Sequence, residues 1–170
     1  MRIFKEEQRF TQSRLIILLF VILIAPLALI TKKYLQEDST MSASKFITTI
    51  AIIIFFIAFI LFLKLSTRID EKGIYYRFFP FHFKTRTIPW EDFKKVYTRK
   101  YNSITEYGGW GLKSGLPWRK SKGVAYNVKG DKGIQLELLN GKKILIGTQK
   151  RAEVDRALKS YEHKIITNEN

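Results

Sequence analysis

The sequence predicts a helical hairpin of two membrane spans, followed by a mainly β barrel or sandwich of about seven strands that a C-terminal helix caps. Three observations predict this architecture. Apolar residues are concentrated in two uncharged blocks before Lys64. After Lys64, short runs of alternating apolar and polar residues are separated by turn residues, which is typical of strands. Near the C-terminus, apolar residues recur with helical spacing.

The two hydrophobic blocks run from Leu15 to Ile30 and from Phe46 to Leu63, and charged residues occur only at their borders. A membrane-spanning helix needs about 20 apolar residues, with a range of roughly 17 to 25. A cleaved signal peptide is the alternative for the first block, but no small-x-small cleavage site follows it. We therefore expect spans at about 15–31 and 46–63 within a hairpin of residues 14–64.

A short polar connection between the spans places both chain ends on one side of the membrane. The segment after Lys64 is heavily basic, and basic residues are retained in the cytoplasm. We expect a protein of the cell membrane, plasma or inner, with a cytoplasmic N-terminus and C-terminal domain. Residues 1–13 are expected to form a juxtamembrane segment, in which Phe4 and Phe10 either anchor it at the interface or belong to a helical extension.

Residues 65–170 are predicted to form the β domain. Asn140-Gly141 is a strong signal for a two-residue hairpin between two of its strands. Thr148 is a good N-cap for a helix over about 149–164, whose apolar residues share one face. The expected strands cover 66–69, 74–79, 81–88, 94–101, 124–128, 134–138 and 143–146.

Parts of this domain resemble bacterial pleckstrin-homology-like (PH-like) domains, which often follow a membrane hairpin. The opening resemblance lies in Thr67–Ile74 and in Arg86–Val96, which contains an Ile-Pro-Trp corner. The stretch Gly133–Leu158 resembles their final hairpin and C-terminal helix. The resemblance implies a PH-like barrel and a membrane-anchored protein. It implies no particular activity, because this fold hosts unrelated functions.

Charge and composition narrow the classes of function. The net charge is +15, and the 22 basic and 11 acidic residues from Leu65 onward give the β domain +11. Such a domain attracts polyanions, and a membrane tether favours lipid headgroups over nucleic acid, for which we expect no binding. The chain has no cysteine, and His82 and His163 are far apart in sequence. We expect no cofactor, no metal site and no catalytic activity.

The segment from Tyr107 to Gly123 holds half of the chain's ten glycines and two of its three tryptophans. One interpretation is a loop that contacts anionic lipid or a partner. The other is structural: a bulged strand whose tryptophan fills the barrel, followed by a solvated loop. The candidate contact residues are Lys113, Trp118, Arg119, Lys120 and Lys122. The candidate structural residues are Gly108, Gly109, Trp110 and Gly111.

These features favour a membrane-anchored, non-enzymatic binding or scaffolding module. The expected partners are the bilayer itself, with anionic lipid headgroups, another membrane protein or a second copy of the chain as candidate ligands. The alternative is an accessory subunit of a membrane enzyme or transporter. Both spans lack ionisable residues, and such residues mark transport pathways, so the binding module is the stronger hypothesis.

Overall fold

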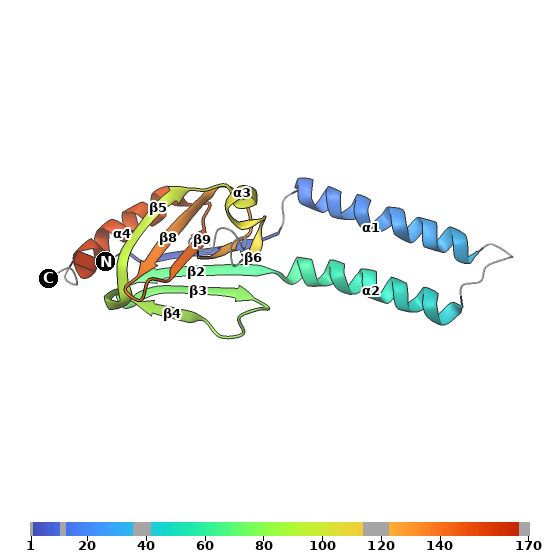
Figure 1. Ribbon diagram of the computed structural model, residues 1–170, viewed down its shortest axis with the longest axis horizontal. Coiled ribbons are helices and arrows are strands. Elements are labelled where there is room, and N and C mark those ends of the chain that lie inside the picture. The colour runs from blue at the N-terminus through green and yellow to red at the C-terminus, as the bar shows by residue number, and fades with distance from the viewer. Residues whose placement is uncertain (1, 11–12, 36–41, 114–122, 167–170) are drawn as a thin grey trace. The chain divides into compact units, whose positions relative to one another are not determined.

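The computed structural model describes residues 2–10, 13–35, 42–113 and 123–166. The chain divides into two compact units. The helical unit comprises Phe10–Leu63, and the β unit joins Met1–Arg9 to Lys64–Asn170. The helical unit is therefore inserted into the chain of the β unit, between its first strand and its second (Figure 1).

The helical unit consists of α1 (Ser13–Tyr34) and α2 (Ala43–Phe62). Within them, Ile16–Tyr34 and Ala43–Phe62 are long and apolar enough to cross a membrane. The Thr31 hydroxyl donates a hydrogen bond to the Leu27 carbonyl 2.8 Å away, so this polar side chain is satisfied within its own helix. Two apolar helices joined by a short connection agree with the predicted helical hairpin.

The first sheet of the β unit is a four-stranded antiparallel meander in the order β1-β2-β3-β4. In its register, Arg9 of β1 is paired with Lys64 of β2, which is paired with Phe79 of β3. The opposite end of the β2–β3 pair closes through Glu71 and Lys72. The strands are β1 (Phe4–Arg9), β2 (Lys64–Asp70), β3 (Gly73–Phe79) and β4 (Arg86–Pro89).

Phe4–Arg9 forms a strand of the first sheet, neither the interfacial anchor nor the helical extension that was expected for this segment. In this strand Phe4, Glu6 and Gln8 are buried and the residues between them are exposed. The two buried polar side chains bind the C-terminal part of the domain. Glu6 accepts hydrogen bonds from the Thr148 hydroxyl (2.6 Å) and the Gln149 N–H (2.8 Å), and the Gln8 amide donates to the carbonyl of Gly147 (2.8 Å).

The second sheet has five strands in the order β5-β8-β9-β7-β6, antiparallel except for the parallel β7–β9 pair. The hairpin predicted at Asn140-Gly141 joins β8 to β9. Gly141 has a φ of 81°, and the Asn140 side chain accepts the Lys142 N–H at 3.0 Å. The strands are β5 (Phe93–Lys100), β6 (Gly111–Lys113), β7 (Val124–Asn127), β8 (Lys132–Leu138) and β9 (Lys143–Gly147).

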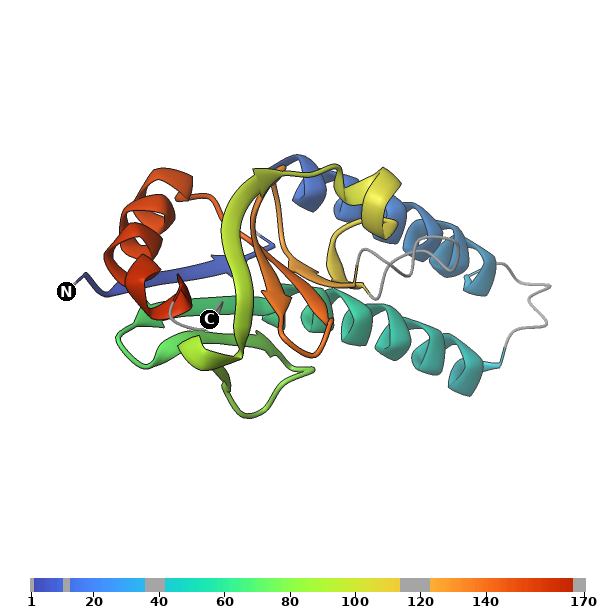
Figure 2. The same cartoon turned by 60° about the vertical axis from the view of Figure 1, so that its left-hand side comes forward.

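Helix α4 (Arg151–Ile166) packs beside β5 and against the start of the first sheet (Figure 2). Its buried face includes Val154 and Tyr161. The Tyr161 ring stacks on Trp90 with centroids 5.2 Å apart. Trp90 begins the 3-10 turn η1 (Trp90–Asp92), and its indole N–H donates to the Asp70 carbonyl at 2.9 Å. The helix thus closes one end of the domain, as the sequence predicts.

The described residues form nine strands, compared with the seven expected. The seven expected strands correspond to β2–β5 and β7–β9, although β4 begins only at Arg86, five residues later than expected. β1 and β6 are additional, as is the short helix α3 (Ser103–Tyr107). A mainly β domain with two sheets and a C-terminal helix agrees with the coarse prediction.

Candidate functional site

The structure places one of the five predicted contact residues. Lys113 ends the short edge strand β6 and is partly exposed. Trp118, Arg119, Lys120 and Lys122 lie outside the described residues. The prediction of a lipid- or partner-binding loop in this segment therefore stays a prediction.

The glycine-rich stretch before it has a structural explanation. Gly108 caps α3 in the left-handed conformation (φ 77°), and its N–H bonds the Ile104 carbonyl. Gly111 has a φ of 112° and donates its N–H to the Asn127 side chain at 2.8 Å. The expectation that Trp110 fills the barrel is wrong, because its side chain is 43 % exposed. Of the two tryptophans that the structure describes, Trp90, at the corner before β5, is the buried one.

A different surface emerges as the candidate site: the outer face of the first sheet, which we call the basic face. Alternation in its strands sends every second side chain outward, and basic residues occupy many of these positions. Hydroxyl groups lie among them, on Ser66, Tyr75, Thr85 and Thr87. The basic side chains of this face are Lys5, Arg9, Lys64, Arg68 and Arg77.

Two of these five basic residues are neutralised by carboxylates. Lys64 Nζ lies 2.7 Å from Glu7 Oε1, and Arg68 Nη2 lies 2.7 Å from Asp70 Oδ2. The hydrogen bond from Lys64 lowers the pKa of Glu7, and the nearby positive charges of Arg9 and Arg77 lower it further.

The other three basic residues, Lys5, Arg9 and Arg77, form no ion pair within the described part of the chain. Their charge is therefore not offset by an ion pair with any described residue.

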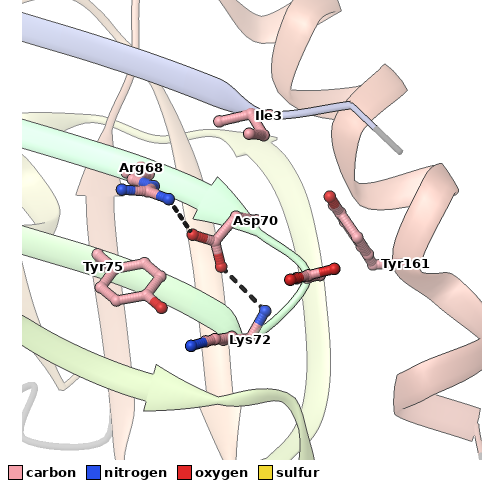
Figure 3. Close-up of a pocket in the computed structure, with 7 residues that line it drawn as sticks. Ile3, Arg68, Asp70, Lys72, Tyr75 and Tyr161 are labelled. Atoms are coloured by element: carbon pink, nitrogen blue, oxygen red, sulfur yellow. Dashed lines mark hydrogen bonds and ion pairs between the residues drawn. The ribbon is translucent and has the colours of Figure 1, made fainter.

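The basic face is hollowed at two adjoining places. A depression of about 570 Å³ lies between β1, β2, β3 and the approach to β4, and Arg77 is among the residues that line it. A second, of about 560 Å³, lies at the end of the sheet beside Tyr161 (Figure 3). Arg68 and Tyr75 line both. Guanidinium and hydroxyl donors around an open hollow can bind the oxygens of a phosphate or a carboxylate.

Figure 3 shows Arg68, which lines both hollows, beside Asp70 and Tyr75. Its guanidinium bonds buried Asp70 and lies over the Tyr75 ring, 5.4 Å from the centroid. Asp70 is fixed in turn, since its other carboxylate oxygen accepts the Lys72 N–H at 2.9 Å. Burial, followed by the negative charge of Asp70, raises the pKa of Tyr75, so this phenol stays protonated and can donate a hydrogen bond.

The guanidinium and hydroxyl groups of this face can donate hydrogen bonds to an anion. Among the described residues, no group of three or more His, Cys, Asp or Glu side chains could hold a metal ion. His82 is buried, and its burial lowers its pKa, with the positive charge of Arg86 as the second cause. Its ring lies against Tyr76 and Tyr126.

Sequence reasoning missed the basic face because it left β1 out of the domain. The sequence did contain a signal for part of this face, in the two predicted strands that correspond to β2 and β3. Arg68 and Arg77 occupy alternate positions between residues that are buried, so both were assignable to an outward face. Lys5 and Arg9 were not assignable in this way, because β1 buries polar residues. Comparison of the chain with protein-family models, with curated proteins and with solved structures finds no match.

Proposed function

We propose that this chain is a membrane-anchored, non-enzymatic binding module, of PH-like type, whose basic face binds anionic lipid headgroups at the surface of the membrane that its two helices span. The observation that supports this proposal most strongly is the pairing of Arg9 with Lys64. These are the last residue before the helical unit and the first residue after it. The basic face is therefore built on the two strands that lead directly into the spans.

The distances favour lipid contact. Paired residues of an antiparallel ladder have Cα atoms about 4.5 to 5.5 Å apart, so both chain crossings lie side by side at one end of the sheet. Strands rise about 3.3 Å per residue, which places the outward residues of β1 and β2 within roughly 20 Å of these crossings. Because β1 and β2 pair in one sheet, we propose that the N-terminal strand and the C-terminal domain lie on the same side of the membrane, the cytoplasmic side.

The charges of the basic face set the expected preference for anionic over neutral lipid. A basic residue near an anionic membrane surface contributes about 1 kcal/mol. Lys5, Arg9 and Arg77 together would contribute about 3 kcal/mol, which is roughly a hundredfold preference for anionic over neutral lipid. Lys64 and Arg68 add little, since each already has a carboxylate partner.

The test uses the full chain in vesicles, because a fragment starting at residue 65 would lack β1. The chain has no cysteine, so Thr87→Cys, on the basic face, carries a single fluorophore. We expect headgroup-quencher lipids to quench this dye more when phosphatidylglycerol is added to phosphatidylcholine. In 1 M salt, where the Debye length is about 3 Å, this gain should disappear.

Two double charge-reversal variants, one on the basic face and one away from it, test whether the response depends on the basic face. Lys5→Glu with Arg77→Glu should abolish the gain from phosphatidylglycerol. Lys94→Glu with Lys142→Glu changes the net charge equally but alters exposed residues of β5 and of the β8–β9 turn, and should leave the gain intact. Equal losses in both double variants would show that only net charge matters, and would overturn the assignment of the basic face.

A protein partner is the second candidate ligand, and one observation favours it. Strand β5 is an edge of the second sheet, and a groove of about 370 Å³ lies between it and α4, lined by Val96, Thr98, Asp155 and Leu158 among others. An edge strand beside a helix can accept an extended peptide as an additional strand. Photo-crosslinking from Lys159, which also lines the groove, should then capture a protein, whereas crosslinking from Arg77 should capture lipid.

A further inference from the structure

The loop between β3 and β4, residues 80–85, carries two exposed phenylalanines, and we call it the aromatic loop. We propose that the aromatic loop inserts Phe81 and Phe83 into the interface between headgroups and acyl chains, as a third attachment to the bilayer besides the two spans. Like the proposed function, this inference requires that the two helices span a membrane. It does not depend on anionic lipid.

Hydrogen bonds order the aromatic loop, and one of its side chains, that of His82, points inward. The His82 N–H donates to the Phe78 carbonyl at 2.8 Å, which closes the turn. The Phe78 N–H in turn donates to His82 Nδ1 at 3.4 Å. The buried imidazole lies against Tyr126 with ring centroids 5.1 Å apart. With His82 fixed inward, its two phenylalanine neighbours are held on the outside.

Both phenylalanines face solvent in the β unit. Phe81 is 50 % exposed and Phe83 is 79 % exposed. Phe81 stacks on Phe78 of β3 with centroids 5.8 Å apart, and Phe83 lies edge-on to Phe79 of β3 at 6.1 Å. Water is an unfavourable environment for such a surface, and grouped exposed apolar residues mark an interaction site.

The position of the loop identifies the partner. Phe79, the residue before the loop, is the ladder partner of Lys64, where the chain returns from the helical unit. Figure 1 shows the loop at the end of the first sheet where β2 begins. Four residues of chain reach at most about 14 Å, so Phe83 lies within roughly 20 Å of Lys64. Any bilayer that α2 crosses is therefore within reach of the loop.

The flanking residues fit the same partner. Lys84 and Arg86 follow the phenylalanines, and both are exposed. Aromatic rings with basic residues beside them suit the boundary between headgroups and acyl chains, where the ring is buried and the cation meets phosphate. The apolar helices are covalently joined to this same end of the sheet, so a soluble protein partner would have to compete with the bilayer that they span.

The experiment measures depth with single fluorophores in the full chain, reconstituted in phosphatidylcholine vesicles at 1 M salt. The salt screens the contacts of the basic face, so the readout reports the aromatic loop alone. A polar dye on Lys84→Cys should be quenched several-fold more by lipids brominated near the top of the acyl chain than the same dye on Leu139→Cys. Leu139 is the matched control, since it is 57 % exposed and its N–H bonds Asp92, at the opposite end of the domain.

A second variant guards against insertion driven by the dye. Phe81→Ser with Phe83→Ser should remove the quenching at position 84, while Ile104→Ser, another exposed apolar residue, should leave it unchanged. Equal quenching at positions 84 and 139, or quenching that survives the double serine variant, overturns the proposal. Protection of position 84 that grows with protein density instead of lipid also overturns it and indicates a second copy.

Failure of this inference is separable from failure of the proposed function. If the dye at position 87 responds to phosphatidylglycerol and the dye at position 84 is not quenched, insertion of the aromatic loop is contradicted and lipid binding by the basic face is supported. If the dye at position 84 is quenched and the dye at position 87 does not respond, lipid binding by the basic face is contradicted and insertion of the aromatic loop is supported.

Discussion

At the end of the first sheet where β2 turns into β3, the large aromatic side chains are buried. Trp90 is 5 % exposed, bonds the Asp70 carbonyl and stacks on Tyr161 of α4. At the other end, where β2 begins and β3 ends, Phe81 and Phe83 face outward and His82 alone of the three points inward. One end has a helix to cover its aromatic residues, and the other has the chain that continues into two apolar helices.

Apolar side chains of the β unit therefore fall into two groups. Residues that α4 can cover contribute to the stability of the β unit. At the Lys64 end, Leu65 and Phe78 are fully buried and also contribute. The exposed Phe81 and Phe83 contribute little, and we propose that they are available to a membrane. Both ends contain aromatic residues, so composition alone does not distinguish them. Substitutions at the two ends should separate a stabilising role at one from a binding role at the other.

The largest expected effect is at the buried end. Trp90→Ala should lower the free energy of unfolding by about 3 to 5 kcal/mol, because it leaves a large cavity under α4. Phe83→Ala, an equally drastic truncation at the exposed end, should change it by less than about 0.5 kcal/mol. Denaturant unfolding of the full chain in detergent, followed by near-ultraviolet circular dichroism, measures both. Similar losses would contradict the division between the two ends.

The next effect concerns β1, the strand that leads into the first span. Glu6→Ala removes the acceptor for the Thr148 hydroxyl and the Gln149 N–H, and should cost about 2 to 3 kcal/mol. Glu7→Ala is the control on the next residue. It breaks an exposed ion pair with Lys64, which is worth at most about 1 kcal/mol. Hydrogen exchange of the β1 amides should rise in the first variant only.

The importance of Glu6 also shows why part of the fold was out of reach of sequence reasoning. A buried carboxylate is read as an exposed residue unless its partners are known, and its partner Thr148 lies 142 positions away. Non-local pairing of this kind leaves no local periodicity. Trp110 was misplaced for a related reason, since an aromatic residue beside glycine fits either a core or a surface.

Other elements were predictable because their signals are local. The two uncharged blocks correspond to α1 and α2, Asn140-Gly141 forms the β8–β9 turn, and the apolar spacing after Thr148 gives α4. Helix α3 had a local signal that was too short to recognise: Asn102 caps it by accepting the N–H groups of Ile104 and Thr105. The basic face needed both kinds of information, local alternation in β2 and β3 and non-local pairing for β1.

An effect of pH is expected at the inward residue of the aromatic loop. Burial holds the pKa of His82 below its ordinary value of about 6.5, so below that pH the unfolded chain binds a proton that the folded chain does not. Stability should therefore fall as the pH drops from about 6.5 towards the lower pKa, by at most about 1.4 kcal/mol per pH unit. His82→Asn should flatten this part of the unfolding profile, and a steeper or unchanged slope would contradict the assignment.

The smallest effect is that of a single charge on the basic face. Arg77→Gln should weaken the response to phosphatidylglycerol by about 1 kcal/mol, roughly fivefold, because it removes one cation that has no carboxylate partner among the described residues. Lys94→Gln, on β5, should change it by much less. The dye on Thr87→Cys, titrated with increasing phosphatidylglycerol, measures both. An equal weakening in the two variants would contradict a direct contact between Arg77 and the anionic lipid.

The central claim is that the Lys64 end of the first sheet faces the bilayer and the Asp70 end does not. The most direct measurement places a nitroxide on Lys84→Cys or on Lys72→Cys, two exposed lysines in the turns at opposite ends. The full chain is reconstituted in vesicles that contain nickel-chelating lipid, and the relaxation of each nitroxide by the surface nickel is recorded. We predict strong relaxation at position 84 and none at position 72 beyond that caused by nickel in solution. Equal relaxation at the two positions, or stronger relaxation at 72, would contradict the account.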